Sequence, residues 1–128
     1  MEVENQQKKV LLVDDEIDIC DFLAEYLEER NIKAYTATDI ENAFKIAKTN
    51  KIDLVFLDNN LLHIVKGVEF IPHFKMFNPN CKVIMLTANH QPELKEHARL
   101  QGADGFILKP FDFSSFQEAI DNFITQEG

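Results

Sequence analysis

Three aspartates in this chain stand directly behind runs of apolar residues. Asp14 and Asp15 follow the run Val10–Val13, and Asp58 follows the run Leu54–Leu57. Carboxylates that lie close together repel one another, and a hard dication such as Mg²⁺, which prefers oxygen ligands, relieves the repulsion. An aspartate can also act as a nucleophile and form an aspartyl phosphate. These residue types could therefore support metal-assisted phosphoryl transfer; the alternative is that Asp58 only caps the following helix or turn.

Two further polar side chains, Thr87 and Lys109, also follow short apolar runs. A threonine hydroxyl can hydrogen-bond to a phosphoryl oxygen, and a lysine ammonium can neutralise one. Phosphoryl transfer depends mainly on such positioning and charge neutralisation. Asp58 is the better candidate for the nucleophile because it stands alone, whereas the pair Asp14 and Asp15 is better suited to the metal.

The elements that must position these residues alternate between strands and helices. Short unbroken apolar runs are typical of strands buried on both faces of a parallel sheet, and the segments between them carry apolar residues at helical spacing. Five such alternations imply a doubly wound α/β domain with helices on both faces of a parallel sheet. The expected strands are residues 8–13, 32–37, 52–58, 82–86 and 106–108.

The crossovers of such a sheet bring the carboxyl ends of all strands to the same edge, where ligands usually bind. We therefore expect the candidate residues to meet at that edge, each group arriving from a different strand. This convergence is the main structural prediction. The residues concerned are Asp14, Asp15, Asp58, Thr87 and Lys109.

Three local signals indicate where helices begin or end. Asn31 can adopt the left-handed conformation that ends the first helix. Thr38 and Glu41 have the spacing of a capping box, which predicts Thr38 as the N-cap of the second helix. Pro72 is unsuited to a helix interior, so we expect the third helix to be kinked there or to begin near it. Residues 61–66 carry no clear signal for either type of element.

The composition limits the class of protein. A chain of 128 residues with 45% hydrophobic and 27% charged residues is typical of one globular domain. We expect a flexible N-terminal tail at residues 1–7 and one domain over residues 8–126. The net charge of −9 argues against a general basic surface for nucleic acid. No apolar run approaches the roughly 20 residues that span a bilayer, and the N-terminus is not a signal peptide, so we expect no membrane contact and a cytoplasmic location.

Four motifs, in this order and spacing, resemble those of a known family. They are VLLVDDE at residues 10–16, LVFLD at 54–58, VIMLTA at 83–88 and GADGFILKP at 102–110. Over residues 8–124 the chain resembles the receiver domain of bacterial two-component response regulators, the family that includes the chemotaxis response regulator. The resemblance implies a flavodoxin-like, three-layer fold of five strand–helix units with strand order 2-1-3-4-5.

The resemblance also implies a Mg²⁺-dependent reaction in which Asp58 accepts a phosphoryl group. The donor would be a sensor histidine kinase or a phosphotransfer protein. Asp15, Asp58 and the backbone carbonyl of Asn60 would ligate Mg²⁺, and Asp14 would act through water. Such a protein is not an enzyme that turns over a substrate, because it catalyses only its own phosphorylation and dephosphorylation.

A second group of residues would read out the phosphorylation. By the same resemblance, Thr87, Ala88 and Lys109 would contact the phosphoryl group, and Phe106 would be the aromatic switch that turns inward as Thr87 moves. Phe106 lacks the hydroxyl of the commoner tyrosine. Pro110 is a candidate for a cis peptide bond, since X–Pro is the linkage in which cis is least costly. The downstream target would bind the surface formed by the fourth helix, the fifth strand and the fifth helix.

The loop after Asp58 departs from the family pattern. Leu62 stands where the family usually has a proline, and Gly67 comes one residue later than usual. This insertion leaves open a degenerate receiver that binds partners without being phosphorylated. Two other classes fit less well. A flavodoxin-like cofactor carrier would need a glycine-rich phosphate loop after the first strand, and a haloacid-dehalogenase-type phosphatase would need an aspartate where Asn60 stands.

Overall fold

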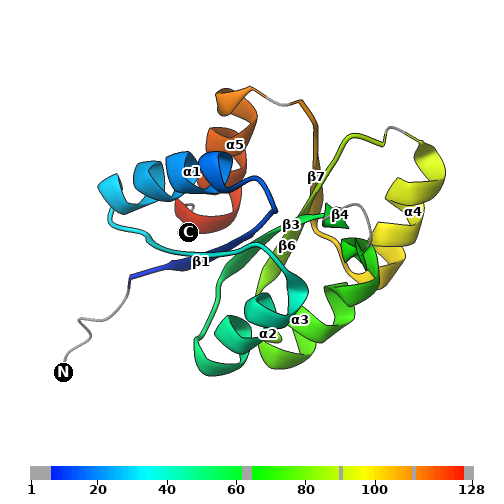
Figure 1. The fold of residues 1–128 in the computed structure, drawn as a ribbon, viewed down its shortest axis with the longest axis horizontal. Helices are drawn as coiled ribbons and strands as arrows, with labels where there is room; N and C mark the ends of the chain where they lie inside the picture. The colour runs from blue at the N-terminus through cyan, green and yellow to red at the C-terminus, as the bar shows by residue number, and fades with distance from the viewer. Residues whose placement is uncertain (1–6, 62–64, 90, 111, 126–128) are drawn as a thin grey trace.

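The computed structural model describes residues 7–61, 65–89, 91–110 and 112–125. Its centre is a five-stranded parallel sheet in the order β2-β1-β3-β6-β7 (Figure 1). In chain order these are the first to fifth strands of the sheet, so the predicted order 2-1-3-4-5 and the doubly wound α/β class are confirmed. The strands are β1 (Lys9–Val13), β2 (Lys33–Ala37), β3 (Leu54–Asp58), β6 (Lys82–Thr87) and β7 (Gly105–Leu108).

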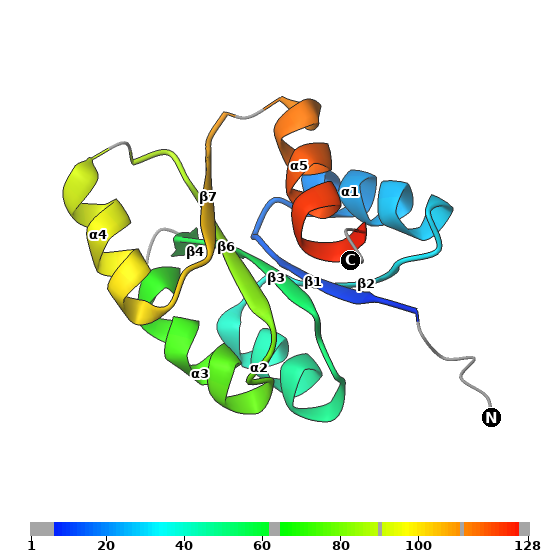
Figure 2. The same ribbon diagram turned by 180° about the vertical axis from the view of Figure 1, so that it is seen from behind.

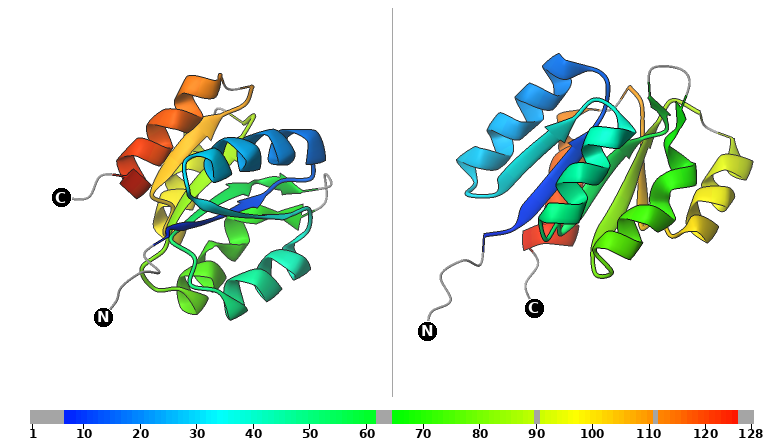
Figure 3. Two further views of the ribbon diagram at one scale, coloured as in Figure 1. Left: turned by 90° about the vertical axis from the view of Figure 1, so that its left-hand side faces the viewer. Right: turned by 60° about the horizontal axis from the view of Figure 1, so that its bottom comes forward.

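Helices cover both faces of this sheet. One face carries α1 and α5, and the other carries α2, α3 and α4 (Figures 2 and 3). The helices are α1 (Ile17–Glu29), α2 (Ile40–Thr49), α3 (Ile71–Phe77), α4 (Pro92–Gln101) and α5 (Phe113–Ile120). Among the described residues, no helix combines the length and the apolar character that crossing a membrane requires.

Helices cover both faces of the sheet, and successive side chains of a strand point to opposite faces. The residues of a central strand are therefore all buried, alternately in one core and in the other. In β3, all five residues are buried. Val55 and Leu57 belong to the core under α2 and α3, whereas Leu54 and Phe56 belong to the core under α1 and α5. An unbroken apolar run therefore predicted the strand correctly, and it explains why Asp58 arrives at the end of the most deeply buried element.

Two of the three signals at helix ends were interpreted correctly. Asn31 has the predicted left-handed conformation, with a φ of 63°. Helix α3 begins at Ile71, with Pro72 in its first turn, so the second of the two options for Pro72 is confirmed. A 3₁₀ helix, η1 (Gly67–Phe70), precedes it.

The capping box at Thr38 was wrong by one residue. Asp39 is the N-cap of α2, and its Oδ1 accepts a hydrogen bond of 2.8 Å from the backbone N–H of Asn42. The Asn42 side chain returns a bond to Asp39 Oδ2 at 3.1 Å. This bond is a side-chain pair in which Asn42 donates, so it differs from the bond to the N-cap N–H that a capping box would have given Glu41. Aspartate and threonine are both good N-caps, and the sequence pattern alone did not decide between neighbours.

The segment without a clear signal contains a small antiparallel hairpin, β4 (Asn60–Leu61) and β5 (Val65–Lys66), which pairs Asn60 with Lys66. Leu61 is buried, with 1% of its surface exposed. Residues 62–64 lie outside the described part of the chain, as do residues 1–6 of the expected N-terminal tail. A π-helical turn, η2 (Asp121–Thr125), follows α5.

Candidate functional site

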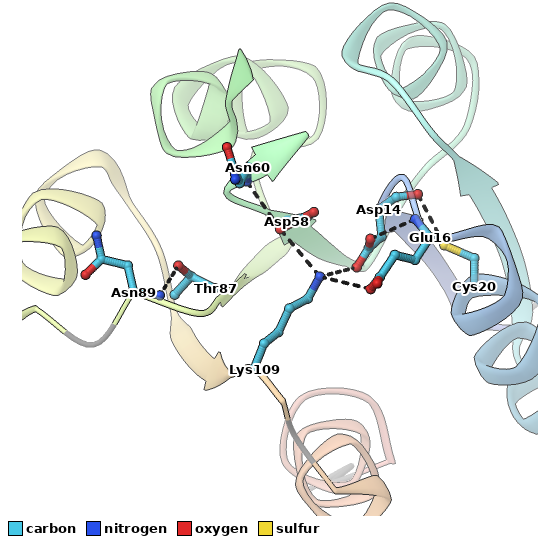
Figure 4. Close-up of polar contacts among 8 residues, drawn as sticks. All are labelled: Asp14, Glu16, Cys20, Asp58, Asn60, Thr87, Asn89 and Lys109. Atoms are coloured by element: carbon cyan, nitrogen blue, oxygen red, sulfur yellow. Dashed lines mark hydrogen bonds and ion pairs between the residues drawn. The ribbon is translucent and has the colours of Figure 1, made fainter. Parts of the chain in front are cut away.

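The predicted convergence at the carboxyl edge of the sheet is present, and Figure 4 shows four of its residues, Asp14, Asp58, Thr87 and Lys109. Asp14 and Asp15 directly follow β1, Asp58 is the last residue of β3, and Thr87 is the last residue of β6. Lys109 directly follows β7. Residues that are separated by up to 95 positions in the chain thus meet in one place.

Three carboxylates form a cluster with the geometry of a cation site. One oxygen from each of Asp14, Asp15 and Asp58 can be chosen so that all three lie within 4.8 Å of one another. Asp14 and Asp58 are almost fully buried, with 2% and 4% of their surface exposed. Burial raises the pKa of Asp58 above its ordinary value, and the charge of Asp14 raises it further, while the charge of Lys109 opposes the rise.

The ammonium of Lys109 lies among these acids. Its Nζ is 2.9 Å from Oδ2 of Asp14, 3.5 Å from Oε1 of Glu16 and 3.6 Å from Oδ1 of Asp58. Burial acts to lower the pKa of Lys109, but the hydrogen bond and charge of Asp14, together with the charges of Asp58 and Glu16, outweigh it and raise the pKa. Lys109 is therefore a cation in this pocket, placed where it can neutralise an oxyanion next to Asp58.

The donor set fits a hard divalent cation. It consists only of oxygen atoms, from two aspartates after β1 and one at the end of β3, and Mg²⁺ typically binds one or two carboxylates together with water and phosphate oxygens. The main chain after Asp58 is held close to the cluster, because the N–H of Asn60 donates to Asp58 Oδ1 at 3.2 Å. These are the positions at which Asp15, Asp58 and the Asn60 carbonyl were expected to hold the ion.

Two residues that organise the loop after Asp58 were given no role in the sequence analysis. Asn59 is buried, with 7% of its surface exposed, and its Oδ1 accepts the backbone N–H of Val68 at 3.0 Å. Gly67 passes so close to Asp58 that an added Cβ would lie 2.3 Å from the carbonyl oxygen of Asp58. The sequence signals for these two roles were the amide that follows Asp58 and the position of Gly67, one residue later than usual. Neither signal by itself shows that Asn59 is buried or that Gly67 passes close to Asp58.

The predicted switch residues flank the acids. Thr87 is 4% exposed, its Oγ1 accepts the N–H of Asn89 at 3.0 Å, and its carbonyl accepts the N–H of Lys109 at 2.8 Å. Phe106 lies on β7, partly buried against the core under α2 and α3, and the Nζ of Lys95 is 5.7 Å from the centre of its ring. The structure thus places Phe106 next to α4, on the strand that leads to Lys109.

The remaining predicted positions, Ala88 and Pro110, lie beside the cluster. Ala88 is exposed and, with Lys109 and Pro110, borders a mainly apolar groove of about 430 Å³ that also contains Phe22 and Phe113. The peptide bond between Lys109 and Pro110 is cis, as the resemblance predicts.

Among the residues that the structure describes, Cys20, Cys81, His73 and His97 take no part in the cluster. Cys20 lies behind the acids, where its Sγ donates to the carbonyl of Asp14 at 3.6 Å, and burial raises its pKa to about 12. Cys81 is likewise buried and unbridged. His73 stacks on Phe44, and His97 pairs with Glu69 at 3.1 Å.

Comparisons with known proteins agree with this geometry. The sequence model of the family described as the response regulator receiver domain matches residues 10–121. The chemotaxis protein CheY of Halobacterium salinarum is 36% identical over 118 residues, which cover 92% of this chain and 98% of that protein. The sporulation initiation phosphotransferase F of Bacillus subtilis is 26% identical over 117 residues, which cover 91% of this chain and 94% of that protein.

A solved structure shows the same architecture. The chemotaxis protein CheY4 of Vibrio cholerae matches with a TM-score of 0.83 at 28% sequence identity, covering 92% of this chain and 99% of that one. The family match extends over most of the chain and includes all of the sheet except Lys9, together with all of the converged residues. The chain therefore belongs to the family of response regulator receiver domains.

Proposed function

We propose that this receiver domain is a phosphoacceptor switch in which Asp58 takes a phosphoryl group from a sensor histidine kinase or a phosphotransfer protein. The observation that carries the proposal is the position of Asp58, which is nearly buried, 3.6 Å from the Lys109 ammonium and within one carboxylate cluster with Asp14 and Asp15. One of the relatives described above is named a phosphotransferase, which accords with this chemistry.

Asp15, Asp58 and the backbone carbonyl of Asn60 would hold Mg²⁺, with Asp14 contributing through water. When bound, the ion supplies positive charge that offsets the carboxylates and the incoming phosphoryl oxygens. The residues of the chain do the rest. An oxygen of Asp58 attacks the phosphorus of the donor phosphohistidine, the phosphorus–nitrogen bond breaks, and the imidazole leaves with the electron pair and takes up a proton from solvent.

Lys109 and Thr87 would hold the new phosphoryl group. The lysine is already charged and oriented toward Asp58, so it can bind a phosphoryl oxygen with little rearrangement. The Thr87 hydroxyl now accepts the N–H of Asn89. After phosphorylation it would give up this bond and donate its proton to a phosphoryl oxygen. The switch thus begins with a local change of hydrogen-bond partners next to β6.

The readout would be a shift between two conformations of the face formed by α4, β7 and α5. Phe106 lies on this face, beside Lys95 of α4. A groove of about 510 Å³ runs across the same face and contains Lys95, Phe106, Asp112 and Glu118. A downstream target protein would bind there. The domain itself would act without direct nucleic acid or membrane contact, in the cytoplasm, and would not turn over a separate substrate.

The degenerate receiver is the second candidate, and the inserted residue in the loop before Gly67 favours it. It would keep the fold and the partner-binding face without accepting phosphate. It predicts that the chain binds its target equally well before and after exposure to a phosphodonor.

The decisive experiment exposes the protein to Mg²⁺ and acetyl phosphate and maps the modified residue by tandem mass spectrometry. We expect a single aspartyl phosphate on Asp58, and none in Asp58→Asn or in wild-type protein treated with EDTA. Uptake that persists in Asp58→Asn would overturn the assignment. No uptake by the folded wild type, either from acetyl phosphate or from a histidine kinase, would favour the degenerate receiver.

A further inference from the structure

The buried amide of Asn59, directly after the proposed acceptor, joins three parts of the chain. Its backbone N–H donates to the carbonyl of Leu86 on β6 at 2.9 Å. Its backbone carbonyl accepts the N–H of Gly67 at 2.9 Å, and its side-chain Oδ1 accepts the N–H of Val68 at 3.0 Å. Asn59 therefore closes the base of the β4–β5 hairpin and connects it to η1, using both its main chain and its side chain.

These bonds determine which way the next residue faces. In an antiparallel ladder, pairs of residues that are hydrogen-bonded to each other alternate with pairs that are not. Asn59 and Gly67 are hydrogen-bonded, so the next pair, Asn60 and Lys66, is of the type without hydrogen bonds between its members. The N–H and C=O of Asn60 therefore point away from Lys66, toward the same edge of the strand. The N–H on that edge donates to Oδ1 of Asp58. The Asn60 carbonyl consequently faces the side on which the carboxylate cluster lies.

The Val68 bond is the part of this arrangement that depends on the identity of the side chain. The site of that bond is buried, so an apolar residue at position 59 would leave the Val68 N–H without its acceptor. The loop between Asp58 and Gly67 is one residue longer than in the family pattern. Because the entropic cost of closing a loop grows with its length, a longer loop needs additional contacts to hold its first residues in place. An amide side chain at position 59 supplies such a contact.

We infer that Asn59 is a positioning residue that holds the Asn60 carbonyl at the carboxylate cluster and thereby sets the affinity for Mg²⁺. The inference rests on the proposed function, because it assumes that this cluster binds the ion. Asn59 itself does not contact the ion. It acts as the outer partners of metal ligands commonly do, and loss of such a partner typically weakens metal binding about 10- to 100-fold.

The test is a titration of the Asn59→Leu variant of the whole 128-residue chain with Mg²⁺, monitored by isothermal titration calorimetry. Leucine has a similar size but cannot accept the Val68 bond. We expect Mg²⁺ binding at least about tenfold weaker than in the wild type, and rescue in Asn59→Asp, which keeps an oxygen at the same place. We also expect a matching increase in the Mg²⁺ concentration for half-maximal phosphorylation by acetyl phosphate, with little change in the rate at saturating Mg²⁺.

Asn78→Leu is the matched control for a purely structural asparagine. The side chain of Asn78 makes two bonds to the main chain, with Oδ1 accepting the N–H of Ile52 at 3.2 Å and Nδ2 donating to the carbonyl of Ala47 at 2.9 Å, but Asn78 lies before β6, at the opposite end of the sheet. Its substitution should lower the melting temperature and leave Mg²⁺ affinity unchanged. If Asn59→Leu does not fold, Asn59→Ala provides the same test with a smaller side chain.

The outcomes separate this inference from the proposed function. Folded wild-type protein that binds no Mg²⁺ would refute the proposed function. Wild-type protein that binds Mg²⁺, together with folded Asn59→Leu and Asn59→Ala variants that bind it equally well, would refute the role of Asn59 and leave the proposed function intact.

Discussion

The Nζ of Lys109 lies 2.9 Å from Oδ2 of Asp14, a carboxylate with only 2% of its surface exposed. This ion pair joins the end of the last strand of the sheet to the end of the first. It places a positive charge inside the acidic cluster, so that the protein carries part of its own counter-charge. The compensation is incomplete, because the pKa of Asp58 is still raised by burial and by the charge of Asp14.

The raised pKa of Asp58 predicts that Asp58→Asn stabilises the protein at neutral pH in the absence of divalent cations. Between the ordinary pKa of 3.8 and the raised one, the folded state binds more protons than the unfolded state. The free energy of unfolding therefore falls as the pH rises through this interval and stays lower above it. Asparagine removes this loss. Thermal unfolding in EDTA between pH 4 and pH 8 measures it, and about 1 kcal/mol corresponds to roughly 4 °C for a chain of this size.

An exposed acid provides the control for that experiment. Asp18→Asn, on the first turn of α1, removes the same formal charge outside the cluster and should change the melting temperature little. A melting temperature of Asp58→Asn below that of the wild type at pH 7 would contradict the prediction.

Removal of the lysine should act in the opposite direction. In Lys109→Met the buried carboxylates lose their internal cation, so we expect the metal-free protein to lose about 1–3 kcal/mol of stability, less than for a fully buried pair because the lysine side chain is 19% exposed. Mg²⁺ should then stabilise the variant more than it stabilises the wild type, since it replaces the missing charge. Melting temperatures measured across a Mg²⁺ titration test both expectations, and equal stabilisation of the two proteins would contradict the second.

Gly67→Ala should disturb the site through sterics alone. The added Cβ would lie 2.3 Å from the carbonyl oxygen of Asp58, so the main chain must move. Overpacking of this kind typically costs about 1–3 kcal/mol, and the movement should also weaken Mg²⁺ binding, because Asp58 and Asn60 shift with it. Chemical denaturation and calorimetry measure the two effects.

A second glycine distinguishes this effect from ordinary backbone strain. Gly102, after α4, has a φ of 115°, and a Cβ there would make only ordinary contacts, the nearest at 3.5 Å. Gly102→Ala should therefore cost about 1 kcal/mol through its left-handed conformation, with no change in Mg²⁺ affinity. Equal Mg²⁺ affinities in the two glycine variants would show that the approach to Asp58 is unimportant.

The thiols offer a check on the packing beneath the site. Burial raises the pKa of Cys20 to about 12 and that of Cys81 to about 11, so almost no thiolate is present at pH 8. We expect the folded protein to react very slowly with iodoacetamide, and the protein unfolded in urea to react at the rate of an ordinary thiol. Cys20→Ser isolates the signal of Cys81. Rapid labelling of the folded wild type that is lost in Cys20→Ser would show that the region around Cys20, next to Asp14, opens readily.

The sequence was most informative where burial produces a simple pattern. The run Leu54–Leu57 is apolar because both faces of β3 are covered, and this alone predicted a strand that ends in Asp58. Convergence of the five candidate side chains then followed from the right-handed crossovers of a parallel sheet, without knowledge of any contact. The resemblance added the cis peptide at Pro110, which no pattern in the residues indicated.

The sequence was least informative where a few residues are held by contacts that are distant in the chain. The strands of the β4–β5 hairpin have only two residues each, too few to show a period. The buried side chain of Asn59 is hydrogen-bonded to the N–H of Val68, nine positions later, whereas asparagine is most often exposed. The error of one residue at the N-cap of α2 arose because Thr38 and Asp39 are both suitable caps.

The proposed switch can be tested with a single tryptophan as fluorophore, because the chain contains no tryptophan of its own. Phe106→Trp places an indole of similar shape on β7, next to the ammonium of Lys95. If Thr87 and Phe106 move together, Mg²⁺ with beryllofluoride should change the emission of this tryptophan, and Thr87→Ala should reduce the change while Asp58 still binds beryllofluoride. Phe77→Trp, at the far end of α3, should respond little. An unchanged response in Phe106→Trp combined with Thr87→Ala would separate the aromatic residue from the threonine and locate the readout elsewhere.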